Sequence, residues 1–144
     1  MAEDADEDGY VVVYWDTSAV LSVLLKDNHT EEARKWAKKN GLHLISTLAY
    51  AEMCSVIFRM QKEGILDPAP AAAVMTALDS GPWSQVTAWP DRKVVRHLAS
   101  KWSLRGADLW HLGTAKTLKE QLQKITLLTY DARLLSAARG EGLS

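Results

Sequence analysis

Cysteine is almost absent from this chain of 144 residues, and Cys54 is its only thiol. A single cysteine excludes an internal disulfide, which is typical of proteins from a reducing compartment. Zinc is also disfavoured, because His29, His43, His97 and His111 are scattered without the ligand spacing of a tetrahedral site.

The chain also lacks an apolar run long enough to span a membrane. The stretch 11–25 is shorter than the roughly 20 residues that a membrane helix needs, and Asp16 interrupts it. Acidic residues precede this stretch, where a signal peptide would carry basic ones. We therefore expect a cytoplasmic protein without a membrane segment.

A large excess of charge of one sign is absent too, since the formal net charge is −1. Five acids fall within the first eight residues, which leaves 13 acids against 17 Lys and Arg, and so a net charge of +4, for the rest. This mildly basic body permits a polyanionic partner without requiring one. We expect residues 1–9 to form a flexible acidic tail and residues 10–144 to form one domain, because the length suits a single core.

Short apolar segments alternate with helical patterns along the chain. The patterns predict strands at about 11–15, 42–45, 85–89 and 125–129, and helices at about 17–26, 29–40, 47–63, 68–80, 90–104, 107–121 and 131–140. Short apolar strands separated by helices indicate a mainly parallel sheet of four or five strands. We therefore expect a three-layer α/β/α sandwich, with ligands bound where the carboxyl ends of the strands meet.

Four carboxylates stand in unusually apolar surroundings. Asp16 is the only charged residue of YVVVYWDTSAVLSVLL, Glu52 of STLAYAEMCSVIF, and Asp108 of GADLWHLGTA. Asp131 is the only acid of KITLLTYDARLL. Because an isolated buried charge is costly, such acids are usually paired, protonated or bound to a metal. Their common setting predicts a common site.

Helix capping is the alternative explanation for three of these acids. Asp16 and Asp131 each lie between a predicted strand and a predicted helix, where Asp is a favoured N-cap. Asp108 lies in a first helical turn, where the helix dipole favours negative charge. Glu52 is too far into its helix to cap it, and its apolar neighbours predict that it is buried.

A divalent cation would relieve the repulsion among these acids. Two carboxylates about 5 Å apart repel each other by roughly 3 kcal/mol at an effective dielectric constant near 20. A site made of carboxylate oxygens favours Mg²⁺ or Mn²⁺, and such ions commonly act on phosphate esters. The sequence therefore predicts that Asp16, Glu52, Asp108 and Asp131 are ligands of a shared divalent cation.

The segments YWDTSAVL, STLAYAEMCSVIFR, LRGADLWHLGTA and LLTYDARLLSAA, in this order, resemble the PIN-domain nucleases. They are most similar to the VapC toxins of bacterial and archaeal toxin–antitoxin pairs, and the resemblance covers about residues 10–143. It implies a three-layer α/β/α fold and a Mg²⁺- or Mn²⁺-dependent endoribonuclease that cleaves RNA with metal-activated water. The resemblance also implies that the same four residues are catalytic, with Asp16 and Asp108 as the central metal ligands and Glu52 and Asp131 completing the acidic site.

The resemblance also implies partners and supporting residues. A cognate VapB-type antitoxin would obstruct the site, and the toxin would form a homodimer or a larger toxin–antitoxin assembly. Ser18 and Thr129 fall where family members place small hydroxyl residues near the acids, which implies a supporting role beside a turn or capping role. The alternative function is a catalytically idle PIN-like protein that only binds RNA or a protein partner.

Five cations near these motifs are candidate RNA contacts: Arg59, Lys62, Lys101, Arg105 and Arg133. They would offset the repulsion between an acidic pocket and the RNA phosphates. An ordinary solvated surface role is the alternative for each of them.

His111 lies one turn after Asp108 on the same helical face, and no second histidine has the spacing of a metal site. We therefore expect a packing or hydrogen-bonding role for His111. The six tryptophans of the chain predict core packing, with an apolar groove for a partner helix or a dimer as the alternative.

Overall fold

The computed structural model describes residues 9–144, so the predicted acidic tail, except for Gly9, lies outside the described residues. In chain order the elements are β1 (Val11–Trp15), α1 (Thr17–Leu24), α2 (Thr30–Ala37), β2 (Gly41–Ser46), α3 (Thr47–Lys62), α4 (Pro68–Ser80), β3 (Trp83–Val86), α5 (Arg92–Lys101), α6 (Gly106–Leu122), β4 (Thr126–Leu128) and α7 (Ala132–Gly140). None of the helices in this described part is long and apolar enough to cross a membrane.

The four strands form one sheet in the order β3-β2-β1-β4, and each pair of neighbours is parallel. Trp15 at the end of β1 pairs with Ile45 of β2 and with Leu128 of β4. The carboxyl ends of these strands therefore share one edge of the sheet, as predicted for a parallel α/β fold.

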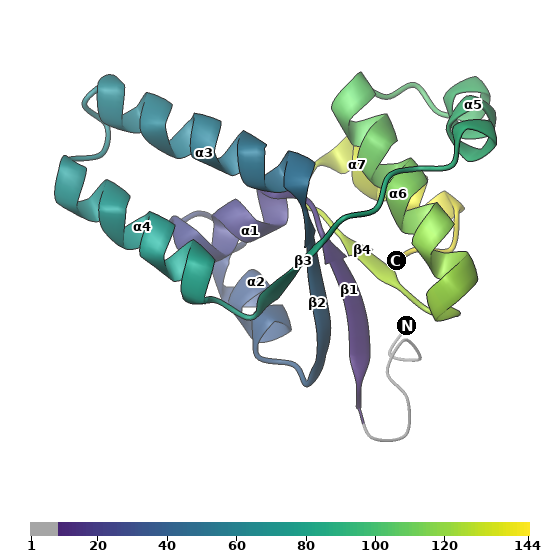
Figure 1. The fold of residues 1–144 in the computed structure, drawn as a ribbon, viewed down its shortest axis with the longest axis horizontal. Helices are drawn as coiled ribbons and strands as arrows, with labels where there is room; N and C mark the ends of the chain where they lie inside the picture. Colours follow the sequence, from purple (N-terminus) through teal and green to yellow (C-terminus); the bar gives the residue numbers. More distant parts are fainter. Residues whose placement is uncertain (1–8) are drawn as a thin grey trace.

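Helices cover both faces of the sheet, because successive strand side chains point to opposite sides. Tyr14 and Leu127 face a core built with α5, α6 and α7, whereas Val13, Trp15 and Ile45 face a core built with α1 to α4. Figure 1 shows these two groups of helices on opposite sides of the strands. The predicted three-layer sandwich is confirmed, and burial on both faces explains why the strands are apolar throughout.

The third strand lies earlier in the chain than the predicted 85–89, since β3 spans Trp83–Val86. Val86 pairs with Ser46, the last residue of β2, and the chain then turns into α3. Residues that follow Val86 have no neighbouring strand with which to pair. The length of β2 therefore decides where β3 ends, and this information is not local to the predicted segment.

Candidate active site

All four predicted acids line one cavity at the carboxyl edge of the sheet. Asp16 directly follows β1, Asp131 follows β4 as the N-cap of α7, Glu52 lies on α3, and Asp108 lies in the first turn of α6. The cavity has a volume of about 230 Å³ and is completed by Thr17, Ser18, Leu21 and His111. No lysine or arginine stands among these described lining residues, so the lining itself does not neutralise the carboxylates.

Asp16 is almost completely buried, with 4% of its surface exposed. Its Oδ1 accepts hydrogen bonds from the Ala19 backbone N–H at 2.9 Å and from the Ser18 hydroxyl at 2.7 Å. Its Oδ2 accepts one from the Thr129 hydroxyl at 2.5 Å. Burial raises the pKa of Asp16, although these three donors act to lower it. Asp16 thus caps α1 and lines the cavity at once, with Ser18 and Thr129 beside it as predicted.

Glu52 is half-buried, with 34% of its side chain exposed, so the prediction that it is buried was wrong. Part of α3 faces solvent, as the exposed side chain of Phe58 shows, and the apolar sequence does not reveal this. Glu52 Oε1 accepts hydrogen bonds from the Thr17 hydroxyl at 2.7 Å and from His111 Nε2 at 3.0 Å. The hydrogen bond from His111 lowers the pKa of Glu52 more than partial burial raises it, so Glu52 is ionised at neutral pH.

His111 connects Glu52 to the core, and it is 2% exposed. Its Nδ1 lies 2.7 Å from the hydroxyl of Tyr14, whose pKa is raised by burial. Because the Glu52 carboxylate can only accept, Nε2 carries the ring proton, and in the neutral imidazole Nδ1 then accepts from the Tyr14 hydroxyl. The hydrogen-bonding role predicted for His111 is confirmed, but the sequence did not single out Tyr14 or Thr17.

Asp108 and Asp131 complete the cavity from the α6 and α7 side. Asp108 accepts no hydrogen bond from any described residue; burial raises its pKa, and the charge of Asp131 raises it further. Asp131 Oδ1 caps α7 by accepting hydrogen bonds from the backbone N–H groups of Arg133 at 3.1 Å and Leu134 at 3.0 Å. Capping is therefore confirmed for Asp131, and its Oδ2 has no hydrogen-bond partner within residues 9–144.

The chemistry of this donor set fits a hard divalent cation such as Mg²⁺ or Mn²⁺. In the present arrangement, no three His, Cys, Asp or Glu side chains of residues 9–144 form a group that could hold a metal ion. Asp16, Glu52 and Asp131 are instead turned towards hydroxyl, imidazole and backbone donors. Each still has an unused carboxylate lone pair, and both oxygens of Asp108 are without a described donor.

Two of the five candidate RNA contacts lie beside this cavity. Arg105 and Arg133 line a second cavity of about 340 Å³, whose lining includes Asp108 and Asp131. The two cavities therefore adjoin, and both arginines lie next to the carboxylates, while their contact with RNA remains a prediction.

The other three candidate contacts lie elsewhere. Lys101 forms an ion pair with Glu141 at 2.8 Å. Arg59 and Lys62 lie about 10–15 Å beyond Glu52 along α3, given the rise of an α-helix, and line neither of the two cavities. Lys101 therefore has a structural role in this arrangement, and Arg59 and Lys62 remain predictions.

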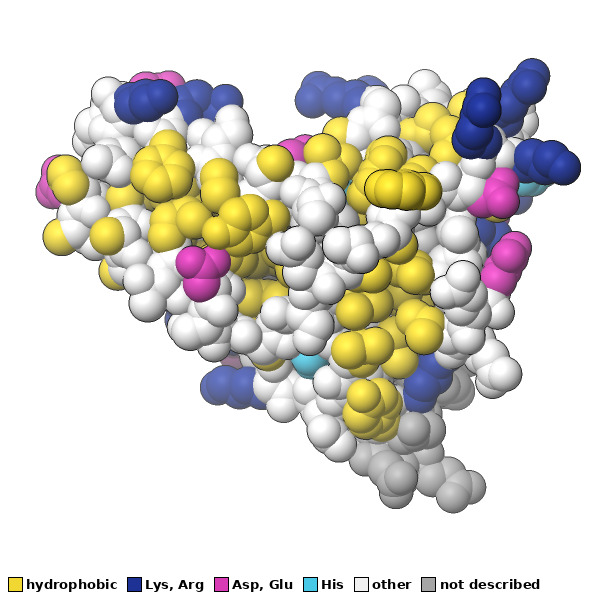
Figure 2. Space-filling model, viewed as in Figure 1, with side chains coloured by type: hydrophobic (Ala, Val, Ile, Leu, Met, Phe, Trp, Pro, Cys, Tyr) yellow, Lys and Arg dark blue, Asp and Glu magenta, His cyan; other side chains and the backbone are white. Residues whose placement is uncertain are grey.

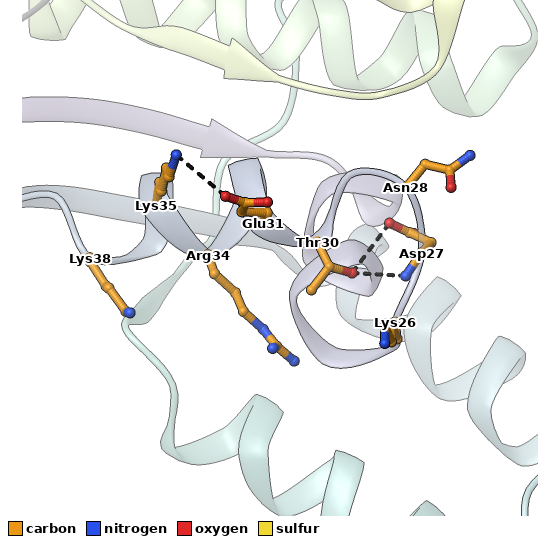
Figure 3. Close-up of a pocket in the computed structure, with 8 residues that line it drawn as sticks. All are labelled: Lys26, Asp27, Asn28, Thr30, Glu31, Arg34, Lys35 and Lys38. Atoms are coloured by element: carbon orange, nitrogen blue, oxygen red, sulfur yellow. Dashed lines mark hydrogen bonds and ion pairs between the residues drawn. The ribbon is translucent and has the colours of Figure 1, made fainter.

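A larger cavity of about 600 Å³ lies beside α2, away from the four acids (Figure 3). It is lined by Lys26, Asp27, Asn28, Thr30, Glu31, Arg34, Lys35 and Lys38. The Thr30 hydroxyl donates to Asp27 at 3.4 Å, and Glu31 pairs with Lys35 at 3.7 Å. The acids of this surface are thus partnered locally, and none of the four candidate catalytic residues reaches it.

Comparison with known proteins identifies the family to which the four acids and the fold point. The family model described as PIN domain matches residues 13–140, a span that contains all four acids. Ribonuclease VapC47 of Mycobacterium tuberculosis (strain CDC 1551 / Oshkosh) is 29% identical in an alignment of 135 positions that covers 91% of this chain and 93% of the relative.

Two solved structures share the fold. PAE2754 from Pyrobaculum aerophilum has a TM-score of 0.61 at 20% identity, over 88% of this chain and 84% of that chain. VapC20 of Mycobacterium tuberculosis, described as a Sarcin-Ricin loop cleaving toxin, has a TM-score of 0.55 at 14% identity, over 87% and 94% of the two chains. Since the family model spans nearly all of the described residues, the chain belongs to the PIN domain family.

Proposed function

We propose that this protein is an endoribonuclease and the toxin of a VapBC-type toxin–antitoxin pair. The observation that carries the proposal is that four carboxylates from four elements line one cavity, which adjoins a second cavity with two arginines. Membership of the PIN domain family and the similarity to Ribonuclease VapC47 support the same activity.

The proposed cofactor is Mg²⁺, with Mn²⁺ as a substitute, held by Asp16, Glu52, Asp108 and Asp131. When bound, the cation would make water more acidic and stabilise negative charge on the phosphate and the leaving oxygen. No lysine or arginine among the described lining residues balances these four acids, which supports a cationic ligand.

The residues of the chain then divide the remaining tasks. Thr129 and Ser18 hold Asp16 in place through its two oxygens. His111 and Thr17 keep Glu52 ionised and oriented, so that a carboxylate is available to accept a proton from the attacking water. Asp131 is an alternative acceptor through its free Oδ2.

The two arginines beside the acids have a separate task. Arg105 and Arg133 would bind phosphates next to the scissile one and offset the repulsion between the RNA and the acidic cavity. Arg105 precedes α6 without capping it through its side chain, so its guanidinium is not used by the helix that follows.

Replacement of Asp108 by Asn is the sharpest test of this proposal, because no described residue donates a hydrogen bond to Asp108 and the fold should survive. Cleavage of single-stranded RNA with Mg²⁺ or Mn²⁺ is expected to fall roughly 100-fold or more in Asp108→Asn. The control is Asp67→Asn, because Asp67 precedes α4 without a side-chain capping hydrogen bond and lies outside the cavity.

Undiminished cleavage by Asp108→Asn would exclude the proposed site. A wild-type protein that binds RNA but cleaves none with either metal would establish the catalytically idle alternative instead.

We further propose that the protein acts in the cytoplasm and binds a VapB-type antitoxin, and that it forms a homodimer. Apolar side chains support an interface: Trp89 is 79% exposed and Ile65 is 63% exposed. Figure 2 shows apolar side chains gathered in two areas of one face, over α3 and α4 and over the side of α6. Sedimentation should give twice the 16.0 kDa of the chain, and a mass of 16.0 kDa would contradict a homodimer.

A further inference from the structure

Three adjoining cavities, which we call the groove, begin at the carboxylates and share lining residues from one to the next. The first cavity shares Asp108 and Asp131 with the second, and the second shares Leu104, Ala132 and Arg133 with a third cavity of about 470 Å³. The three cavities follow one another between the 102–105 loop and the first turns of α7. A strand bound at the acids would therefore have two further cavities beside it on this side of the protein.

The far end of the groove differs in chemistry from the acidic end. The third cavity is lined by Trp102, Ser103, Leu104, Ala132, Arg133 and Ser136. It combines an indole ring, small apolar groups, two hydroxyls and a guanidinium, and none of its described lining residues is an acid. An aromatic surface beside hydroxyl groups and a cation suits a nucleobase that is attached to a phosphate chain.

Trp102 is already held in place before any ligand binds. Its indole N–H donates to Glu141 Oε2 at 2.9 Å, and Glu141 also pairs with Lys101 at 2.8 Å and Lys116 at 3.0 Å. The indole ring lies against Gly140, where an added Cβ would come within 2.4 Å of it. Because the ring is fixed, little conformational entropy is lost when a base stacks on it.

We propose that the cavity at Trp102 binds a nucleobase of the RNA substrate, while Arg105 and Arg133 contact the phosphates between that base and the scissile bond. This inference rests on the proposed ribonuclease function and identifies where the substrate strand is held. The bound nucleotide is unpaired, because a base inside a duplex is stacked on its neighbours and cannot enter a side-chain cavity. The substrate is therefore single-stranded on this side of the cleavage point.

An abasic scan of a short single-stranded RNA tests this inference. The affinity of the Asp108→Asn protein for a fluorescently labelled RNA is measured with Mg²⁺ present, with one nucleotide at a time replaced by an abasic one. An abasic nucleotide at one position is expected to weaken RNA binding roughly tenfold, the effect of losing one base stacked on an aromatic ring. This position should lie a fixed number of nucleotides from the point where the wild-type protein cleaves.

Ser136→Trp, in the Asp108→Asn background, then fills the cavity from the exposed surface of α7 without changing the core. This variant is expected to bind the intact RNA roughly tenfold more weakly, and the abasic penalty should disappear. The matched control is Thr76→Trp, at an exposed position of α4 outside the three cavities, which should leave the scan unchanged. In the same background, Trp102→Phe should keep the penalty, because it preserves an aromatic face.

The possible results separate the inference from the proposed function. If the wild type cleaves RNA but the scan is flat, or if Ser136→Trp leaves the penalty unchanged, the base lies elsewhere and the inference is overturned alone. If the protein neither binds nor cleaves RNA, the proposed function is overturned, and the inference with it.

Discussion

Hydrogen bonds connect Glu52 to His111 and His111 to Tyr14 in the protein core. Removal of the Tyr14 hydroxyl should therefore affect both stability and catalysis. Tyr14→Phe keeps the ring but removes the hydroxyl that donates to His111 Nδ1 at 2.7 Å. A buried acceptor that loses its donor costs about 1–3 kcal/mol in the free energy of unfolding, which urea denaturation measures. RNA cleavage should fall as well, because the ring proton is no longer held on the nitrogen that faces Glu52.

The control is another tyrosine with a hydroxyl bond at the surface. The Tyr50 hydroxyl donates to Asp79 at 3.0 Å in an exposed setting, so Tyr50→Phe should change the free energy of unfolding by less than about 0.5 kcal/mol. Equal losses in the two variants would contradict the role assigned to Tyr14.

Glu141 is a buried carboxylate outside the site, with 8% of its surface exposed. Burial acts to raise its pKa, but hydrogen bonds from Lys101, Trp102 and Lys116 outweigh this effect and bring the pKa to about 2. The folded pKa is below the unfolded value of 4.5, so the unfolded state binds more protons between these values. This contribution to stability is therefore complete above pH 4.5 and is lost as the pH falls towards about 2.

Glu141→Gln keeps an acceptor for the indole but removes the charge. At neutral pH it should lower the free energy of unfolding by at most about 3 kcal/mol, as the shift of its pKa implies. The difference from wild type should shrink as the pH falls from 4.5 to about 2. Urea denaturation at neutral pH and near pH 3 measures this difference. A difference that is the same at every pH would show that the charge of Glu141 is not the cause.

The four acids could be found from the sequence because isolation in an apolar segment is a local property. Their hydrogen-bond partners could not all be found in this way. The contact of Thr17 with Glu52 joins residues 35 positions apart, and that of Tyr14 with His111 joins residues 97 positions apart. Such contacts arise only when the helices pack. The burial of Glu52 was predicted wrongly for the same reason, since it depends on which side of α3 the packing covers.

Helix starts were easier to predict than strand ends, and the reason is again how local each signal is. Ser46 caps α3 by accepting a hydrogen bond from the Ala49 backbone N–H at 3.0 Å, within three residues of itself. The end of β3 depends instead on the length of β2, which lies some forty positions earlier in the chain. The existence of the third strand was therefore predictable, but its position was not.

Strands β1 and β2 approach each other closely at Gly41. An added Cβ would lie 2.0 Å from the backbone oxygen of Val11, so Gly41→Ala must push the two strands apart. We expect the free energy of unfolding to fall by about 1–3 kcal/mol, towards the upper value because backbone is the obstacle.

Gly106→Ala is the matched control, since no atom lies within 4 Å of a Cβ at the start of α6. It should stabilise the protein by about 0.4–1 kcal/mol, because alanine restricts the unfolded chain. Urea denaturation of both variants measures the two changes, and the opposite order would refute the packing argument.

At the scale of the whole molecule, the site exists because a parallel sheet brings distant segments to one edge. β1 and β4 are neighbours in the sheet although they are far apart in the sequence, and this places Asp16 near Asp131. Helix α3, which follows β2, adds Glu52, and helix α6, which follows α5, adds Asp108. Strand–helix alternation was sufficient to predict that Asp16 and Asp131 share this edge, because the topology of parallel sheets leaves few other arrangements. Glu52 and Asp108 lie within helices, so they were assigned to the site from their apolar surroundings and from the resemblance to PIN-domain nucleases.

The same convergence concentrates negative charge, and this has a consequence for the stability of the whole fold. A divalent cation that binds only the folded arrangement should raise the free energy of unfolding by about 2.7 kcal/mol at one hundred times its dissociation constant. The melting temperature of wild-type protein in chelator should therefore rise by several degrees when Mn²⁺ or Mg²⁺ is added. Asp108→Asn should show little or no rise, whereas Asp67→Asn should behave as wild type.

Without metal, we expect Asp108→Asn to be more stable than wild type, the opposite of the order expected with metal bound. Burial and the charge of Asp131 raise the pKa of Asp108, so the ionised form of Asp108 is disfavoured by folding. A neutral amide of the same shape removes this repulsion, and Asp108→Asn should melt above wild type in chelator. Saturating Mn²⁺ should then place wild type above the variant. This crossing distinguishes a cation site from a general effect of salt, which would move both proteins in the same direction and leave their order unchanged.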